Sequence, residues 1–174
     1  MRGNLTWQPY AESLDLVAEP VRRRAAELPG LEVARIDPDL ADTAAFCAAY
    51  ETPPEHSANC VIVAGARGGE VRYAAVLVLA TMQADVNGAV RKAIDVRKVS
   101  FAPMADAVSR TGMEYGGITP IGLPPEWPIL IDSAVLAAGD VVIGAGVRAA
   151  KILAPAHCLL ALPGARELAL ARTS

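Results

Sequence analysis

The sequence has few of the features that mark a membrane-bound or secreted protein. Its longest apolar run, residues 73–82, is about half as long as a membrane-spanning helix. The first fifteen residues turn polar and acidic where a secretory signal needs an apolar core. The three cysteines include no C-x-x-C pair, so neither a disulfide framework nor a cysteine metal site is indicated. We therefore expect a cytoplasmic protein.

Histidine is equally scarce, and this argues against a metal centre. His56 and His157 are about a hundred residues apart, and neither has a partner at ligand spacing. We interpret His56 as a surface residue and His157 as a packed core residue. No serine lies in a G-x-S-x-G turn, so nothing indicates a Ser-His-Asp triad. The cysteines, Cys47, Cys60 and Cys158, lie in apolar stretches and are predicted to pack as small hydrophobic residues.

Positive charge is also in deficit. The chain has 16 Lys and Arg against 19 Asp and Glu, for a net charge of −3. This is the wrong sign for a protein that holds nucleic acid by long-range attraction, so we expect no DNA partner. A local RNA contact has two candidate groups, residues 22–24 and the group of Arg91, Lys92, Arg97 and Lys98. Solvated helix faces and strand ends are the favoured interpretation of both.

The composition that remains is that of a globular protein. Hydrophobic residues make up 53% of the chain and charged residues 20%. No linker, repeat or low-complexity segment interrupts the 174 residues. We expect one α/β domain over residues 1–174, in which residues 1–46 form a helix-strand-helix start.

Regular elements follow from the apolar spacing. Apolar positions three or four apart predict one helix over residues 10–28, and alternation predicts a strand over 31–36. Residues 43–50 read as a helix that Asp39 or Asp42 could cap. A hairpin is expected over 59–66 and 71–82, around a Gly-Gly turn. Further helices are expected at 85–94, 103–111 and 155–162, and further strands at 98–101, 128–131, 140–144 and 151–153.

Residues 144–149 (GAGVRA) fit the G-x-G-x-x-A pattern of a dinucleotide-binding turn. Such a turn must open a helix that leads to a second strand with an acidic residue. Here residues 148–153 read as a strand, and only 25 residues remain after Ala149. The segment is therefore interpreted as a glycine-rich turn between strands.

Residues 112–127 are so rich in glycine and proline that no regular element is expected there. Long ordered loops of this kind are usually functional. The adjacent Gly116 and Gly117 allow positive φ and close approach of a ligand to the backbone. Pro120 stiffens the loop, so that neighbouring amides can stabilise charge on a carbonyl oxygen during acyl transfer.

At this loop the chain resembles the YbaK/prolyl-tRNA-synthetase-associated editing domains. The resemblance is carried by Thr111-Gly112, by residues 116–123 (GGITPIGL), and by residues 129–132 (ILID). The preceding hairpin and the later segment 142–146 (VIGAG) follow the family order. The resemblance covers about residues 47–162.

The resemblance implies an α/β (α+β) fold in which a mixed, curled sheet is flanked by helices. It implies a free-standing deacylase that hydrolyses the ester between a mismatched amino acid and its tRNA, typically tRNA for proline. Water, assisted by the tRNA's own terminal hydroxyl, would attack the ester, and no metal or organic cofactor would be needed. The implied partner is the acceptor end of aminoacyl-tRNA, and an aminoacyl-tRNA synthetase is a second candidate.

The resemblance also implies site residues. Gly117, Ile118 and Pro120 of the G-x-x-P loop are the expected catalytic group. The expected substrate-binding residues are Asn59, Gly116, Thr119, Ile121, Gly122, Asp132 and Gly144. Ile121 stands where the family prefers phenylalanine.

Asn59 departs from the family, which usually places a lysine at this position of the first hairpin strand. A neutral amide forms weaker hydrogen bonds than an ammonium group. Lys98 or Lys151 could replace the missing charge in space. The alternative is a catalytically impaired member that binds tRNA, an aminoacyl or nucleotide ligand, or a partner protein. A hydrolase of another small ester is a third hypothesis.

Overall fold

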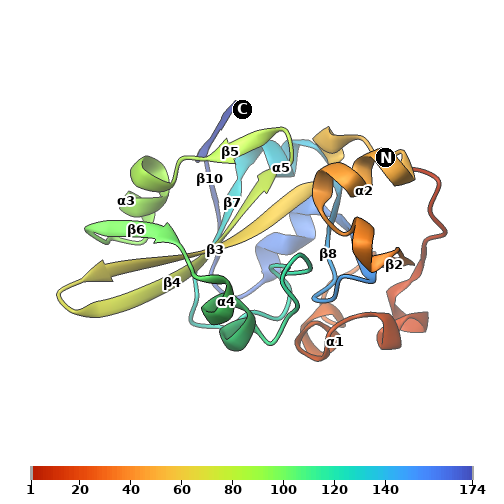
Figure 1. Cartoon of the computed structure of the whole chain (residues 1–174), viewed down its shortest axis with the longest axis horizontal. Helices are drawn as coiled ribbons and strands as arrows, with labels where there is room; N and C mark the ends of the chain where they lie inside the picture. Colours follow the sequence, from red (N-terminus) through yellow and green to blue (C-terminus); the bar gives the residue numbers. More distant parts are fainter. Residues whose placement is uncertain (1, 174) are drawn as a thin grey trace.

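The computed structural model describes residues 2–173, which form two β-sheets, a two-stranded ribbon and short helices (Figure 1). The α-helices are α1 (Glu19–Ala25), α2 (Thr43–Tyr50), α3 (Arg91–Ala93), α4 (Met104–Thr111) and α5 (Ser133–Ala137). The strands are β1 (Gln8–Pro9), β2 (Glu32–Arg35), β3 (Ala58–Arg67), β4 (Glu70–Leu79), β5 (Met82–Ala84), β6 (Lys98–Phe101), β7 (Ile129–Asp132), β8 (Asp140–Gly144), β9 (Ala150–Pro155), β10 (Ala165–Leu168) and β11 (Ala171–Thr173). Short 3₁₀ helices and one π-turn, Val86–Val90, connect them.

The larger sheet has five strands in the order β10-β7-β4-β3-β6. Its centre is the antiparallel β3–β4 hairpin, whose register runs from Ala58 opposite Leu79 to Arg67 opposite Glu70. β7 joins β4 in parallel, so the sheet is mixed as expected. β6 pairs with β3 only over Val63–Ala66. The first half of β3 is therefore left at an open sheet edge.

The smaller sheet has four strands in the order β1-β2-β9-β8, and all its pairs are antiparallel. A parallel bridge from Ser57 to Val142 brings β8 beside the start of β3. The segment with the G-x-G-x-x-A pattern is the turn of the β8–β9 hairpin, in which Gly144 lies opposite Lys151. No helix opens there, so the structure confirms a turn between strands.

The main core lies between the two sheets. Its buried side chains come from β2, β4, β7, β8, β9 and α1, and examples are Val33, Leu77, Ile131, Ile143, Ile152 and Val21. Burial of one such side chain contributes roughly 1.5–3 kcal/mol. A second cluster lies under α3, and a third packs Phe46 of α2 against Val142 and Leu153. These clusters fix α2 and the two hairpins in place.

Several predicted elements are confirmed. Helix Thr43–Tyr50 and strands Lys98–Phe101 and Asp140–Gly144 have the predicted bounds. The loop over residues 112–127 contains no helix or strand. Asp42 occupies the N-cap position of α2, but its side chain makes no capping hydrogen bond. Within residues 2–173, no helix is long and apolar enough to cross a membrane.

The N-terminal prediction is wrong in one respect: residues 10–28 do not form a single helix. They form two 3₁₀ turns followed by the short helix α1. Pro20 is the second residue of α1; because it has no N–H it is tolerated in the first turn but would break the interior of a longer helix. Val17, just before α1, is extended.

The C-terminal part also differs from expectation. His157 is exposed rather than packed, because the neighbouring Ala156 and Leu159 take the buried face of the turn. The predicted strand 71–82 ends at Leu79 and resumes as β5, which pairs with β11 in the separate ribbon. The sequence reasoning missed α5, β1, β10 and β11, all of which are five residues or shorter.

Candidate functional site

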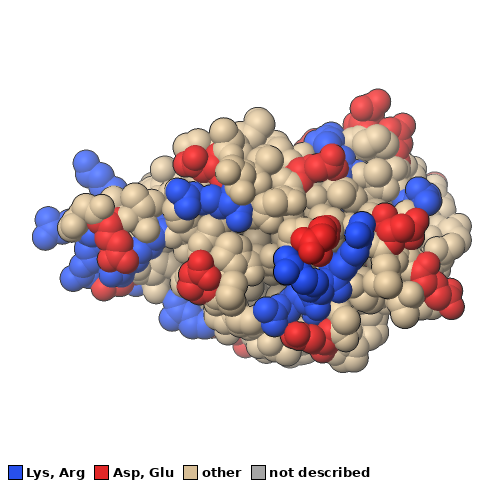
Figure 2. Space-filling model, turned by 90° about the horizontal axis from the view of Figure 1, so that it is seen from below, with Lys and Arg blue, Asp and Glu red and all other residues tan. Residues whose placement is uncertain are grey.

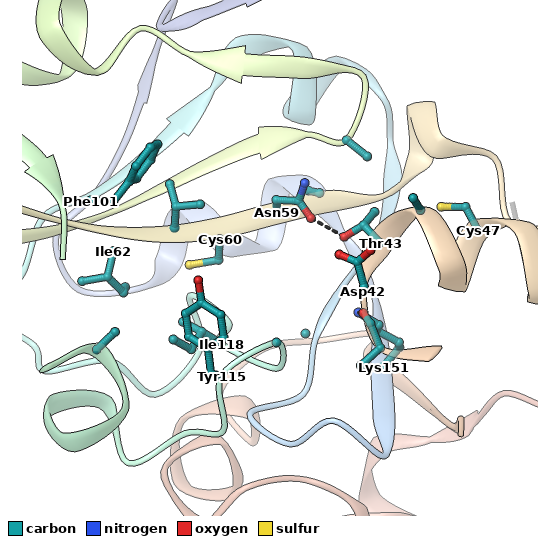
Figure 3. Close-up of a pocket in the computed structure, with 18 of the residues that line it drawn as sticks. Asp42, Thr43, Cys47, Asn59, Cys60, Ile62, Phe101, Tyr115, Ile118 and Lys151 are labelled. Carbon is teal, nitrogen blue, oxygen red and sulfur yellow. Dashed lines mark hydrogen bonds between the residues drawn. The ribbon is translucent and has the colours of Figure 1, made fainter. Parts of the chain in front are cut away.

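A cavity of about 840 Å³ lies between α2, the open edge of β3, the start of α4, the loop at residues 115–118 and the β8–β9 hairpin (Figure 3). This is within the usual size of small-molecule sites. Its lining residues are Ala41, Asp42, Thr43, Ala44, Cys47, Pro54, Ala58, Asn59, Cys60, Val61, Ile62, Ala80, Phe101, Ala102, Ala107, Tyr115, Gly116, Ile118, Gly144 and Lys151. The cavity brings together segments more than a hundred residues apart.

One side of the cavity is apolar. Figure 3 shows Cys60, Ile62, Tyr115 and Ile118 grouped there, away from the polar side chains. Burial raises the pKa of the Cys60 thiol to about 12. The thiol therefore stays protonated at neutral pH, so it acts as a small hydrophobic group and not as a nucleophile.

The opposite side is polar. The Thr43 hydroxyl donates a hydrogen bond of 2.5 Å to Oδ1 of Asn59, and Asp42 and Lys151 lie beside this pair (Figure 3). The bond orients the Asn59 side chain and occupies its oxygen. Its amide nitrogen has no hydrogen-bond partner within residues 2–173, so it can donate to a ligand.

Lys151 is the only lysine or arginine among the cavity-lining residues of the described chain. The residue is 7% exposed, its Nζ donates to the Ala41 carbonyl at 3.0 Å, and it lies 5.1 Å from the centre of the Phe46 ring. No carboxylate within residues 2–173 forms an ion pair with it. Burial lowers the pKa of the Lys151 ammonium to about 8. The cation is thus poorly solvated and close to titration at neutral pH.

The two lysines considered as replacements for the family lysine lie in different places. Lys151 of β9 reaches the cavity past Gly144, its partner in the β8–β9 register. Lys98 of β6 is exposed and lies opposite Ala66. Because Ala66 is seven residues along β3 from Asn59, Lys98 is about 23 Å away along the strand. Only Lys151 is placed to act in the cavity.

The glycine loop is held against the β8–β9 turn. The Gly117 amide donates to the Glu114 carbonyl at 2.9 Å, and the Gly117 carbonyl accepts from the Gly146 amide at 2.7 Å. A Cβ on Gly117 would lie 2.6 Å from the Val147 backbone, so no larger residue fits. The Gly117 amide is therefore occupied, whereas the Ile118 amide has no partner within residues 2–173.

Arg148 is a positioning residue that the sequence reasoning did not single out. Its guanidinium donates to the Tyr115 carbonyl at 3.2 Å and to the Pro38 carbonyl at 3.1 Å. Its backbone amide donates to the Glu114 carboxylate at 2.7 Å. These bonds tie the loop before Gly116 to the β8–β9 turn. Gly116 itself has a φ of 89°, the positive value that favours glycine.

The structure divides the predicted site residues into two groups. Four line the cavity: Asn59, Gly116, Ile118 and Gly144. The others, Gly117, Thr119, Pro120, Ile121, Gly122 and Asp132, are not among its lining residues. Thr119 and Ile121 are fully buried beneath the loop, and Gly122 packs against the Pro20 backbone with a φ of 95°.

The Asp132 carboxylate forms hydrogen bonds that stabilise the fold. One carboxylate oxygen caps α5 by accepting from the Ala134 amide, and the other accepts from the Leu170 and Ala171 amides. Both oxygens are engaged, and the side chain is 4% exposed. Asp132 therefore joins β7 to the C-terminal segment.

The sequence reasoning also missed two polar and two aromatic residues that line the cavity. Asp42 and Thr43 carried only a helix-start signal, and nothing in the sequence pairs Thr43 with Asn59. Phe101 and Tyr115 line the cavity and are 63% and 52% exposed, so both are accessible at its mouth. Within residues 2–173, no group of three or more His, Cys, Asp or Glu side chains could hold a metal ion.

Comparisons with known proteins agree with this geometry. The family model of the aminoacyl-tRNA editing domain matches residues 37–157, a range that contains all the lining residues of the cavity. No curated protein matches the chain.

Solved structures share the fold. One is described as a candidate trans-editing enzyme for prolyl tRNA synthetase, with a TM-score of 0.73 and 20% identity over 90% of this chain and 99% of that one. A structure from work on epitope grafting onto scaffold proteins has a TM-score of 0.75 and 20% identity, over 89% and 97% of the chains. A hypothetical protein has a TM-score of 0.73 and 19% identity, over 82% and 92%.

Proposed function

The chain belongs to the aminoacyl-tRNA editing domain family, and on that premise we propose that it is a free-standing cytoplasmic deacylase of mischarged aminoacyl-tRNA. The observation that carries this proposal is the cavity, which joins an unpaired loop amide to a buried lysine within the family-matched segment. Likeness to the candidate trans-editing enzyme supports tRNA for proline as the RNA. We propose the acceptor end of this tRNA as the partner, with a synthetase as a second one.

The reaction is hydrolysis of the ester at the end of the RNA. Water forms a bond to the carbonyl carbon, the ester C–O bond breaks, and one proton of the water passes to the leaving ribose oxygen, which is released as a hydroxyl. Negative charge develops on the carbonyl oxygen, and the Ile118 amide, which has no partner within residues 2–173, can donate a hydrogen bond to it. One such preorganised donor contributes roughly 10²- to 10³-fold in rate.

Lys151 supplies the charge that Asn59 does not. Its ammonium is held by the Ala41 carbonyl and lies at the polar side of the cavity, beside the Asn59–Thr43 pair. In this reading Lys151 and the Asn59 amide together hold the polar part of the aminoacyl ester. The other predicted loop residues support the conformation of the loop without lining the cavity. They are Gly117, Thr119, Pro120, Ile121 and Gly122.

The test is deacylation of tRNAs charged with alanine, cysteine, serine, threonine or proline. Wild type is compared with Lys151→Met, with Asn59→Lys, and with Arg35→Met as a control that removes a cation from the surface. Gly117→Ala is unsuitable, because the added Cβ collides with the Val147 backbone. Hydrolysis of one ester that is retained in Arg35→Met and lost in Lys151→Met would support the proposal.

A second candidate function is a non-catalytic binder of tRNA or of an aminoacyl ligand. The Asn59–Thr43 hydrogen bond favours it, because the family's lysine position is occupied by a neutral side chain engaged elsewhere. Wild type that is inactive, together with activity in Asn59→Lys, would select this candidate. Inactivity of every variant toward all five esters would contradict the deacylase.

A further inference from the structure

The chain is acidic overall, yet one end of it is basic. Figure 2 shows Lys and Arg side chains gathered at its left end, where Figure 1 places the tip of the β3–β4 hairpin. Arg67 and Arg72 of the hairpin are balanced by two carboxylates, since both pair with Asp95 and Arg72 also pairs with Glu70. Arg91, Lys92, Arg97 and Lys98 have no carboxylate at ion-pair distance within residues 2–173. This end therefore carries uncompensated positive charge.

Three of these cations surround a second hollow of about 690 Å³ between the hairpin, β6 and the segment before α3. Its lining residues are Ala64, Gly65, Ala66, Val71, Asn87, Arg91, Arg97, Lys98, Val99 and Ser100. None of them is acidic. A concave surface lined by charge of one sign focuses the field and attracts an ion of the opposite sign. Phosphate groups are the ligand that Arg and Lys recognise best in this setting.

β6 borders both the hollow and the cavity, since its first three residues line the hollow and its last residue lines the cavity. Lys98, the first residue of β6, lines the hollow, and Phe101, its last residue, lines the cavity with its ring largely exposed. The three steps between them span about 10 Å. Three stacked nucleotides rise by a similar distance, at about 3.4 Å each.

We propose that β6 is a track for the single-stranded end of an RNA. The terminal base stacks on Phe101 at the mouth of the cavity, and the preceding phosphates bind Lys98, Arg97 and Arg91. A positive groove beside an exposed aromatic ring is the usual architecture for single-stranded nucleic acid. The proposal rests on the proposed function only in taking tRNA as the RNA.

The other basic segment does not have these properties. Arg23 and Arg24 of α1 form ion pairs with Glu19 and Glu27, and the Arg22 guanidinium donates to the Leu14 carbonyl. This segment is not among the lining residues of either hollow. It therefore offers a matched control, in which two cations can be removed without touching the track.

The experiment measures binding of uncharged tRNA at several salt concentrations, which requires no catalysis. Arg97→Gln/Lys98→Gln is expected to weaken binding and to lower the slope of log Kd against log salt by about 1.4, because two phosphate contacts to a single strand are lost. Arg23→Gln/Arg24→Gln is expected to keep the wild-type slope. Phe101→Ala is expected to weaken binding at least about fivefold with the slope unchanged, since stacking is not ionic.

Hydrolysis of an aminoacyl ester of adenosine, which keeps the neighbouring ribose hydroxyl and lacks the phosphates, serves as the second readout. Arg97→Gln/Lys98→Gln should hydrolyse it at the wild-type rate, since the cavity is intact. Binding of tRNA that depends on these cations, with no hydrolysis of charged tRNA by wild type, would support the track while contradicting the deacylase. A slope unchanged in Arg97→Gln/Lys98→Gln, an equal loss in the α1 control, or no tRNA binding by wild type would overturn the track.

Discussion

Lys151 and Lys98 show how differently one side chain behaves in two regions of this molecule. Lys151 lies in a wall of the cavity, shielded from water, with its pKa lowered to about 8. Lys98 lies on an exposed strand in a basic surface. A buried cation acts at close range and its charge depends on pH, whereas an exposed cation acts on a polyanion and its effect depends on salt. The predictions below separate these two kinds of behaviour.

The largest expected effect is that of Lys151→Met on catalysis. The substitution shortens the side chain by one atom and removes the only lysine or arginine that lines the cavity within residues 2–173. We expect kcat/KM for aminoacyl-tRNA at pH 7 to fall roughly 10²- to 10³-fold, as for loss of one preorganised donor. The fall should be independent of salt. Arg35→Met, which removes an exposed cation, should retain activity within about twofold. A loss in Arg35→Met as large as that in Lys151→Met would mean that the effect is not specific to the buried lysine.

The next largest effect is the pH dependence of the free energy of unfolding. Burial lowers the pKa of Lys151 from 10.5 to about 8, so the unfolded chain binds the extra proton between these values. Stability of wild type relative to Lys151→Met should therefore rise as pH increases from 8 to 10.5, by about 3 kcal/mol. Activity should fall over the start of that window, because the ammonium is lost. Urea unfolding at pH 7, 9 and 10.5 checks the first statement; a flat difference would mean that Lys151 is well solvated.

Asp132→Ala should destabilise the fold without changing the cavity. Three backbone amides lose their acceptor, and two of them are in the C-terminal segment. We expect the free energy of unfolding to fall by about 2–3 kcal/mol. Asp106→Ala, in the first turn of α4, should cost only a few tenths of a kcal/mol. If the folded Asp132→Ala protein had normal stability but no activity, Asp132 would belong to the site after all.

Thr43→Val is expected to have the smallest effect. It removes the hydrogen bond that orients Asn59 and leaves the shape of the Thr43 side chain nearly unchanged. A net loss of about 1 kcal/mol corresponds to roughly a fivefold decrease in kcat/KM. Adding Thr43→Val to Asn59→Ala should give no loss beyond that of Asn59→Ala alone, since Thr43 acts only through Asn59. Additive losses would mean that Thr43 contacts the substrate independently.

The order of the main elements could be predicted from the sequence, because apolar periodicity and glycine or proline breaks determine it locally. Residues 10–28 were misjudged because their apolar spacing suited a helix although Pro20 would break the interior of one so long. The short strands β10 and β11 were missed because their pairing with β7 and β5 depends on distant partners.

The site was less accessible to sequence reasoning than the fold. The glycine loop could be recognised, since its residue types restrict the backbone directly. Which of its amides is free could not be predicted, because that depends on Glu114 taking the Gly117 amide. The approach of Lys151 to the cavity likewise depends on the register of two strands and on Gly144, which leaves no side chain in between.

The central claim is that the cavity hydrolyses an aminoacyl ester with Lys151 as its cation. The most direct test is the single-turnover rate of deacylation at pH 7, with excess enzyme, for the five charged tRNAs. The account predicts rapid hydrolysis of at least one ester by wild type and Arg35→Met, and a rate lowered at least about 100-fold in Lys151→Met. Equal rates in Lys151→Met and wild type, or no hydrolysis by wild type, would contradict it.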